Sequence, residues 1–294
     1  KSISLIIGLD EPEIHLHPYM QRSLIKYLNS VITNNNAEFK TLIKELFEID
    51  EFIGQVIVVT HSPNILLNDY KQIIRFYSVL GVTKIISGSQ FTLGEQLHKH
   101  LYLHFPFIKE AFFSRCAIFV EGDSEFSSFP LFGKKLSIDF DDLGICVIQA
   151  RGDAIHQLIE LASKFGIPSV GVTDKDDGAN PPTLPSHYET NLRDFEAELV
   201  SLIDSGKESI LRAILCAYDS QGVNRTMEAK SLNKRANTKH GIGAAPFTSP
   251  LKLADIVLTD TVNLKAFYIT WFSVCKSYPL GLLIGEHLTL AEIL

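Results

Sequence analysis

The chain has 294 residues, of which 46% are hydrophobic and 21% charged, and a formal net charge of −7 at pH 7. This length allows two domains with a sizeable core, and the composition is that of an ordinary globular protein. The negative charge argues against a generally basic protein that coats nucleic acid. It does not exclude a nuclease, because clustered metal-binding carboxylates make a site acidic until a cation binds.

The four cysteines are scattered without a C-x-x-C pair, as Cys116, Cys146, Cys216 and Cys275. This spacing favours reduced thiols in the cytoplasm over a disulfide framework or a zinc site. The apolar stretch near the end of the chain, residues 266–275, is too short to cross a bilayer. We therefore expect a cytoplasmic protein with no membrane partner.

Two apolar runs near the start of the chain end in side chains that suit nucleotide chemistry. Residues 3–9 predict a buried strand that ends at Asp10 and Glu11, and residues 55–59 predict a second strand just before His61. A nucleotide-hydrolysing site needs an aspartate for the water shell of Mg²⁺, a glutamate that polarises water and a histidine that senses the γ-phosphate. Loops after such strands are where α/β sheets bind ligands, so we expect these three side chains to serve one site.

The other N-terminal residues predict helices and a hairpin. The expected segments are a helix over residues 18–31, a helix over 37–50, a hairpin of 73–79 with 83–87, and a helical stretch over 93–113. Asn34 to Asn36 separate the first two helices, and Gly81 lies in the hairpin turn. Strands and helices are thus mixed in this half, as in an α/β fold.

The segments Asp-Glu-Pro-Glu-Ile-His-Leu-His-Pro at 10–18 and Val-Ile-Val-Val-Thr-His-Ser-Pro at 56–63 resemble the ATP-binding-cassette (ABC) type ATPase core of DNA-repair and defence proteins. The resemblance implies that Asp10 binds Mg²⁺, Glu11 is the catalytic glutamate and His61 is the switch histidine. The chain has no G-x-x-x-x-G-K-[ST] segment to cradle the phosphates. We therefore expect it to be a C-terminal piece of a longer protein. The complete protein would bind ATP with Mg²⁺, whereas this piece alone would not hydrolyse it.

The second half alternates strands with helices. The expected strands are 116–120, 145–149 and 169–173, and the expected helices are 123–136, 153–165, 192–203 and 208–217. This alternation predicts a parallel sheet with right-handed crossovers. Residues 222–250, rich in Lys, Asn and Gly, predict a loop.

Four acidic residues lie where two of these strands end. Glu121 follows the first strand, Glu125 lies one turn into the next helix, and Asp174 and Asp176 form a D-x-D after a later strand. Side chains two apart in a fraying strand end can point to the same side. Oxygen-only ligands suit Mg²⁺ or Mn²⁺, so we expect a divalent metal site here.

The segments Val120-Glu-Gly-Asp-Ser-Glu125 and Val172-Thr-Asp-Lys-Asp-Asp177 resemble the Toprim domain of topoisomerases, primases, recombination factors and OLD-family nucleases. Only the OLD family joins an ABC-type ATPase directly to a C-terminal Toprim domain, so the chain resembles the C-terminal part of an OLD-family ATP-dependent endonuclease. The implied fold class is α/β, with the C-terminal portion of an ABC-type ATPase fold followed by a parallel-sheet Toprim domain and a mostly helical extension. The implied domains are 1–90 for the ATPase part, 91–114 for a helical linker, 115–220 for the Toprim domain and 221–294 for its extension.

The resemblance also implies roles for single residues. Glu121 becomes a metal ligand and the base, Glu125 a ligand of a second metal, and Asp174 with Asp176 the metal-binding pair. The family places a further glutamate on a helix after the D-x-D, for which Glu196 is preferred and Glu198 is the alternative. A late lysine stabilises the phosphate in this family. Lys276 matches its context best, with Lys239 as a rival.

These motifs predict a DNA endonuclease that uses two Mg²⁺ or Mn²⁺ ions and is regulated by an ATPase module. The resemblance implies a role in prokaryotic or phage-related defence, DNA as a partner, a homodimer or higher homo-oligomer, and a partner defence protein. A basic cluster is either a solvated loop or a surface that follows DNA phosphates. Its members are Lys230, Lys234, Arg235 and Lys239.

Two other functions stay open. The alternative is a non-cleaving ABC/Toprim module that binds nucleic acid or regulates a partner, with a Toprim domain that keeps its shape without cutting. A Toprim primase or topoisomerase is a third option, but the sequence shows neither a catalytic tyrosine domain nor a zinc module. Metal-dependent cleavage separates an endonuclease from a silent binding module.

Overall fold

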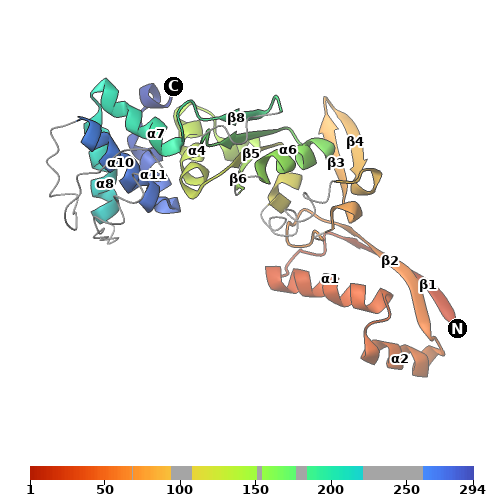
Figure 1. Ribbon diagram of the computed structural model, residues 1–294. Coiled ribbons are helices and arrows are strands. Elements are labelled where there is room, and N and C mark those ends of the chain that lie inside the picture. Colours follow the sequence, from red (N-terminus) through yellow and green to blue (C-terminus); the bar gives the residue numbers. More distant parts are fainter. Residues whose placement is uncertain (68, 94–107, 151–153, 177–183, 221–260) are drawn as a thin grey trace. The chain divides into compact units, whose positions relative to one another are not determined.

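The computed structural model describes residues 1–67, 69–93, 108–150, 154–176, 184–220 and 261–294 (Figure 1). The chain forms two compact units, residues Lys1–Thr92 and Leu93–Leu294. The sequence analysis divides the chain into four parts, with boundaries at residues 90, 114 and 220. This four-part division stays a prediction. Most of the proposed linker and residues 222–250 lie outside the described residues.

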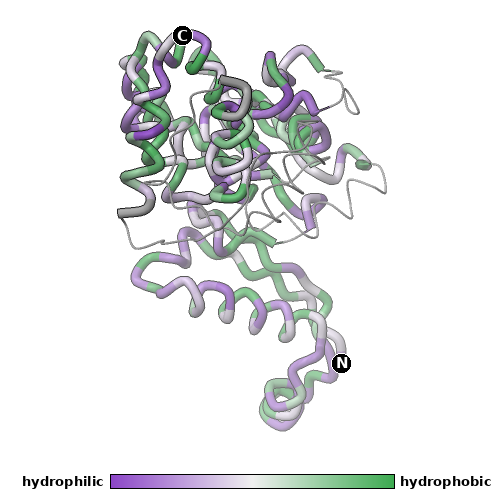
Figure 2. The backbone as a smooth tube through the Cα atoms, turned by 60° about the vertical axis from the view of Figure 1, so that its left-hand side comes forward, coloured by the Kyte–Doolittle hydropathy of each residue, from purple (hydrophilic) through white to green (hydrophobic). Residues whose placement is uncertain are grey.

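The first unit is built on two parallel strands, β1 (Ser2–Asp10) and β2 (Glu51–Val59), with Asp10 opposite Val59. Pairing with β1 extends β2 well before the apolar residues 55–59, so the predicted strand was too short. Helix α1 (Pro18–Ile32) starts with a proline, which suits the first helical turn. Its tube in Figure 2 alternates between hydrophilic and hydrophobic stretches, as in a helix with one buried face.

Helix α2 (Ala37–Phe47) begins where the Asn36 side chain accepts a hydrogen bond from the N–H of Phe39. The predicted end at residue 50 was wrong. Glu48 takes a left-handed conformation with φ 57°, which ends the helix.

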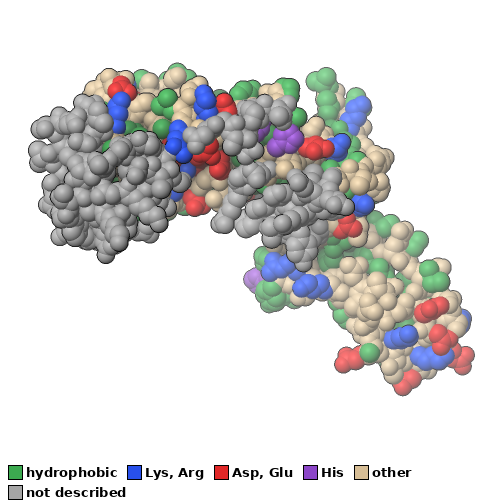
Figure 3. Space-filling view, in the orientation of Figure 1, with side chains coloured by type: hydrophobic (Ala, Val, Ile, Leu, Met, Phe, Trp, Pro, Cys, Tyr) green, Lys and Arg blue, Asp and Glu red, His purple; other side chains and the backbone are tan. Residues whose placement is uncertain are grey.

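The predicted hairpin is confirmed as β3 (Ile74–Val79) paired with β4 (Val82–Ser87). Leu80 and Gly81 connect the strands with positive φ angles of 50° and 78°, as a tight two-residue hairpin turn requires. Two short 3₁₀ turns, η1 (Tyr70–Gln72) and η2 (Gly88–Gln90), flank the hairpin. In the part of Figure 3 that shows this unit, acidic, basic and hydrophobic side chains are interspersed.

The second unit contains a parallel sheet in the order β6-β5-β7-β8. Its strands are β5 (Cys116–Val120), β6 (Ile145–Gln149), β7 (Ser169–Thr173) and β8 (His187–Glu189). The first three confirm the predicted strands. The three-residue edge strand β8 was missed because His-Tyr-Glu forms no apolar run.

Two helices connect the central strands, α4 (Asp123–Lys135) and α6 (Ala154–Lys164). The chain moves from β5 to β6 in one direction and from β6 to β7 in the other. Right-handed crossovers therefore place α4 and α6 on opposite faces of the sheet. The short turns η3 (Lys109–Phe112) and α5 (Phe140–Leu143) precede β5 and β6.

The single helix predicted over 192–203 was wrong. Residues up to Asp194 form a loop, Asp194 caps α7 (Phe195–Val200), and the 3₁₀ segment η4 (Ser201–Ser205) follows. The Asp194 carboxylate accepts a hydrogen bond from the N–H of Ala197 at 2.8 Å. Such a cap fixes the first turn of a helix, and it therefore delays the helix start past Leu192.

The C-terminal part is helical over residues 261–294, as predicted. It comprises α10 (Thr261–Cys275), α11 (Tyr278–His287) and α12 (Leu290–Ile293), which pack near α8 (Glu208–Ser220). Large side chains that are fully buried, among them Leu211, Phe267, Trp271 and Phe272, form their common core. Among the described residues, no helix is long and apolar enough to span a membrane.

Helix α11 also packs closely on α4, next to the sheet. A β-carbon added to Gly281 would lie 2.0 Å from Ser127 Oγ and 2.3 Å from the carbonyl oxygen of Ser124. The ammonium of Lys135, at the end of α4, donates to the carbonyl oxygens of Glu286 and Leu288. The two contacts fix α11 along α4, the first near the start of α4 and the second at its end.

Candidate functional site

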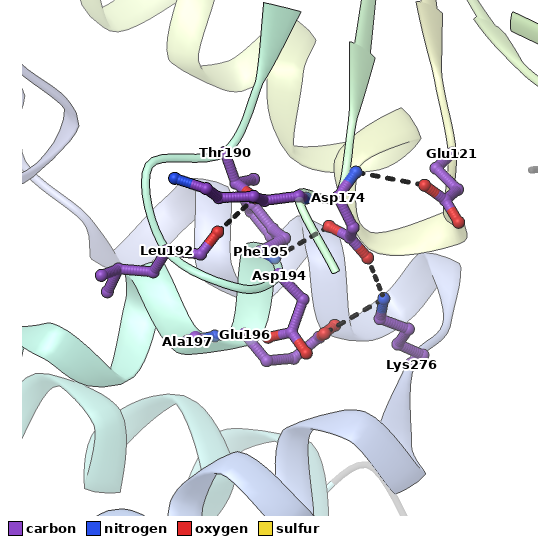
Figure 4. A network of polar contacts seen from close by, with 10 residues as sticks. Glu121, Asp174, Thr190, Leu192, Asp194, Phe195, Glu196, Ala197 and Lys276 are labelled. Carbon is purple, nitrogen blue, oxygen red and sulfur yellow. Dashed lines mark hydrogen bonds and ion pairs between the residues drawn. The ribbon is translucent and has the colours of Figure 1, made fainter. Parts of the chain in front are cut away.

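The site forms at the carboxyl ends of β5 and β7, which pair in parallel up to Val120 and Val172. Glu121 follows the first strand and Asp174 the second. The N–H of Asp174 donates to Glu121 Oε2 at 3.1 Å (Figure 4). The two acidic residues from separate motifs therefore lie together, as the sequence predicted.

The loop before α7 is hydrogen-bonded to the D-x-D segment. The N–H of Phe195 donates to Asp174 Oδ1 at 3.0 Å, and the N–H of Asp176 donates to the carbonyl oxygen of Arg193 at 2.7 Å. These bonds hold the first turn of α7 against the end of β7. Glu196, the second residue of α7, is thereby brought to the same site and is only 3% exposed.

Lys276 lies between two of these carboxylates (Figure 4). Its Nζ is 3.0 Å from Glu196 Oε2 and 3.5 Å from Asp174 Oδ2. Lys276 lies between the end of α10 and Ser277, whose side chain caps α11 by accepting from the N–H of Leu280. Among the described residues, Lys276 thus lies in this cluster, and its rival Lys239 lies outside them.

Glu125 reaches the same neighbourhood from the first turn of α4. It is 4% exposed, and its Oε2 has no hydrogen-bond partner in the described structure. A β-carbon on Gly122 would lie 2.4 Å from that oxygen. The Glu125 carboxylate therefore folds back over Gly122, and the glycine leaves the space in which it lies.

Replacing Gly122 by alanine is expected to move this carboxylate without unfolding the domain, because the crowded atom is the end of a flexible side chain. We expect Gly122→Ala to weaken Mn²⁺ binding, measured by calorimetry, about tenfold, since displacing a ligand costs about as much as losing its supporting contacts. If the effect acts through Glu125, adding Gly122→Ala to Glu125→Gln changes the affinity little further. An unchanged affinity in the single variant would contradict this role for Gly122.

The buried carboxylates hold protons more tightly than free ones. Burial raises the pKa of Glu125 to about 7 and that of Glu196 to about 6, although Lys276 opposes both shifts. Burial also raises the pKa of Glu121 and of Asp174. For Lys276, burial alone would lower the pKa, but attraction by Glu196, Glu125 and Asp174 outweighs it and raises the pKa.

These pKa values predict a pH-dependent effect of Glu125 on stability. Its folded-state pKa of about 7 exceeds the ordinary value of 4.5. The stability that its neutral form contributes is therefore fully present below pH 4.5 and is lost as the pH rises to 7. We expect metal-free Glu125→Gln to gain melting temperature over the wild type as the pH rises across this range. A constant difference between the two proteins would contradict the burial of a titrating Glu125.

The donor set fits a hard divalent cation. All its donors are carboxylate oxygens, which suit Mg²⁺ or Mn²⁺. The buried atoms Glu125 Oε2 and Glu196 Oε1 lack hydrogen-bond partners in the described structure, and a cation would satisfy them. Within the described ranges, however, no three His, Cys, Asp or Glu side chains are already grouped as a ligand set. Two of the carboxylates instead pair with Lys276.

Two candidate ligands are placed differently from the others. Asp176 is exposed and has a φ of 45°, and its backbone rather than its carboxylate makes the contact with the neighbouring loop. Glu198, the alternative to Glu196, accepts a hydrogen bond from the N–H of Leu192 at 2.8 Å and supports the loop. Sequence reasoning missed Asp194, although an aspartate just before a helical apolar pattern is a recognisable capping signal.

In the first unit, the acidic pair and the histidine also come together. Glu11 Oε1 lies 3.3 Å from His61 Nε2, and the exposed Asp10 ends β1 directly before Glu11. The sequence did not single out Glu13, whose Oε1 accepts from Thr60 Oγ1 and from the N–H of His61, both at 2.7 Å. Glu13 thereby links the loops after β1 and β2. The structure thus places the acidic pair and the histidine together where β1 and β2 end.

Comparisons with known proteins match two parts of the chain, an ATPase segment followed by a Toprim domain. Residues 1–66 match the family described as AAA ATPase domain, and residues 112–176 match the overcoming lysogenization defect protein-like Toprim domain. Endonuclease GajA of Bacillus cereus (strain HuB5-5) is 27% identical over 193 residues. That match covers 58% of this chain and 26% of the relative, so the chain spans about a quarter of the relative's length.

Solved structures give weaker likenesses. The C-terminal region of the Burkholderia pseudomallei OLD protein is 21% identical, with a TM-score of 0.32, covering 58% of this chain and 96% of that one. The C-terminal region of the Xanthomonas campestris pv. campestris OLD protein is 18% identical, with a TM-score of 0.30, covering 60% and 94%. The two family matches, in this order along one chain, carry the assignment. An ATPase-type segment ahead of an OLD-like Toprim domain supports assignment of the chain to the OLD family.

Proposed function

We propose that the complete protein is a metal-dependent DNA endonuclease whose Toprim domain cuts the phosphodiester backbone. The observation that supports this most strongly is the cluster of Glu121, Asp174, Glu196 and Lys276 at the carboxyl end of the Toprim sheet. The chain matches a curated endonuclease over more than half of its own length. An all-carboxylate donor set next to a lysine suits phosphate chemistry, because the carboxylates hold cations and the ammonium binds an anionic oxygen.

In this proposal, Glu121 and Asp174 hold one Mg²⁺ or Mn²⁺ ion together with the exposed Asp176. Glu125 and Glu196 contribute to a second ion. When bound, such ions activate the attacking water and stabilise the leaving oxygen. Glu121 also accepts the proton of the attacking water, and its burial raises its pKa, which favours proton uptake.

The first unit suggests how cutting is regulated. Cleavage consumes no ATP, so ATP with Mg²⁺ would act in the complete protein as a conformational signal through Asp10, Glu11 and His61. We propose, from the family resemblance, a role in prokaryotic or phage-related defence and assembly as a homodimer or higher homo-oligomer.

A plasmid-cleavage assay of the complete protein tests the proposal. Supercoiled DNA is incubated with Mg²⁺, Mn²⁺, Ca²⁺ or EDTA, each with and without ATP. We expect nicked or linear product with Mg²⁺ or Mn²⁺ and none with EDTA, and Glu121→Gln is expected to abolish the product. A gel shift without cleavage under every metal condition would instead support the alternative, a silent module that binds nucleic acid.

A further inference from the structure

The ammonium of Lys276 lies between two buried carboxylates. It contacts Glu196 Oε2 at 3.0 Å and Asp174 Oδ2 at 3.5 Å, and these two acidic side chains are only 4% and 9% exposed. Buried carboxylates are costly unless a positive charge compensates them. In the absence of metal, Lys276 therefore supplies the positive charge that these carboxylates require.

One ammonium does not satisfy the whole cluster. Glu125 Oε2 and Glu196 Oε1 are buried without a hydrogen-bond partner in the described structure, and Glu125 lies close enough to interact electrostatically with Lys276. Both carboxylates have unused lone pairs inside the protein. They point to a second positive charge that the described side chains do not provide, and a divalent ion with several oxygen ligands would provide it.

Lys276 and such an ion would compete for the same oxygens. Asp174 is an expected metal ligand, yet its Oδ2 faces Lys276, while its Oδ1 already accepts from the N–H of Phe195. An ion bound at Asp174 or at Glu196 would also repel the ammonium at short range. The lysine has a flexible four-carbon side chain, so it can leave this position without movement of the backbone.

We propose that Lys276 is a built-in counter-ion that a divalent cation displaces from Asp174 and Glu196, which frees its ammonium for an anionic phosphate oxygen. The same lysine thus stabilises the metal-free site and binds the substrate only after metal arrives. This inference rests on the proposed metal-dependent function, and it adds an exchange step that makes Lys276 available only in the loaded site.

The first test measures Mn²⁺ binding to the nucleotide-free complete protein by calorimetry, without any cleavage readout. Lys276→Met keeps a side chain of similar shape and removes the competing charge, so we expect about tenfold tighter binding. Lys276→Arg keeps the charge and should not bind more tightly than the wild type. Lys265→Met is the matched control, because Lys265 pairs with Asp204 away from the site.

The second test uses the wild-type protein and needs no variant to fold. Lysine acetylation is followed residue by residue by mass spectrometry, with and without saturating Mg²⁺. We expect Mg²⁺ to increase the labelling rate of Lys276 several-fold and to leave that of Lys265 unchanged. Labelling of Lys276 that does not respond to Mg²⁺ would overturn the exchange.

The outcomes separate this inference from the proposed function. If Lys276→Met binds Mn²⁺ no more tightly than the wild type, the exchange is wrong, while metal-dependent cleavage can still stand. If neither protein binds Mn²⁺ at all, both the exchange and the proposed metal site are wrong.

Discussion

Replacing Asp174 by asparagine is expected to reduce metal-dependent DNA cleavage by the complete protein about a thousandfold. In the proposed site Asp174 holds a metal ion, and the loss of such a carboxylate would remove several kcal/mol of transition-state stabilisation in metal-assisted hydrolysis. The amide oxygen can still accept from the N–H of Phe195, which Asp174 Oδ1 now accepts at 3.0 Å. Asp174→Asn should therefore keep the start of α7 in place and change the charge of the site. Initial rates of plasmid nicking with Mg²⁺ and with Mn²⁺ measure the loss.

Two further variants show whether the effect belongs to the site. Asp142→Asn makes the same chemical change at an exposed position in α5 and should cut like the wild type. Asp174→Ala also removes the acceptor for Phe195, so we expect it to lower the melting temperature more than Asp174→Asn does. Cleavage by Asp174→Asn at the wild-type rate would show that the Asp174 carboxylate does not hold the metal.

Replacing Gly281 by valine is expected to destabilise the Toprim unit by about 3 kcal/mol or more, because overpacking a tight helix contact forces backbone shifts. The added β-carbon would meet Ser127 Oγ at 2.0 Å and the backbone oxygen of Ser124 at 2.3 Å. A side-chain hydroxyl can rotate away, but the carbonyl of α4 cannot move without the helix. The change in the free energy of unfolding is measured on the complete protein by thermal unfolding and urea titration, from the transition in which the Toprim domain unfolds.

Glu286→Val is the control, because it puts the same β-branched residue at an exposed position of the same helix. It should cost only a few tenths of a kcal/mol in helix propensity. If Gly281→Val proves as stable as Glu286→Val, the close approach of α11 to α4 is not needed for stability.

The sequence predicted the parts of the site that follow strands. Short apolar runs of β5 and β7 end at Glu121 and Asp174, and parallel strands bring such ends to one edge of a sheet. The contact between these two residues therefore follows from local pattern and topology. The position of Glu196 was predicted only through the family resemblance, because the Asp194 cap that starts its helix was read as part of a longer helix.

The position of Lys276 depends on contacts that no periodicity reveals. It reaches Asp174 because α11 lies against α4, and that packing depends on the absence of a side chain at Gly281 opposite Ser124 and Ser127. Shape complementarity between distant helices is a property of pairs of residues, so a single sequence does not show it. The edge strand β8 and the bond from the N–H of Asp176 to the carbonyl oxygen of Arg193 were missed for another reason, because short edge strands and loop contacts leave no apolar pattern in the sequence.

The tether between Lys135 and the end of α11 has a consequence for how this domain can be dissected. The ammonium at the end of α4 holds the carbonyl oxygens of Glu286 and Leu288, so the last helices are fastened to the first helix after β5. A fragment that stops after residue 220 would keep every strand of the Toprim sheet, yet it would lack Lys276 and expose the apolar core of α8. The smallest portion able to carry the complete cluster is therefore larger than the segment that resembles a Toprim domain, and it extends through the C-terminal helices.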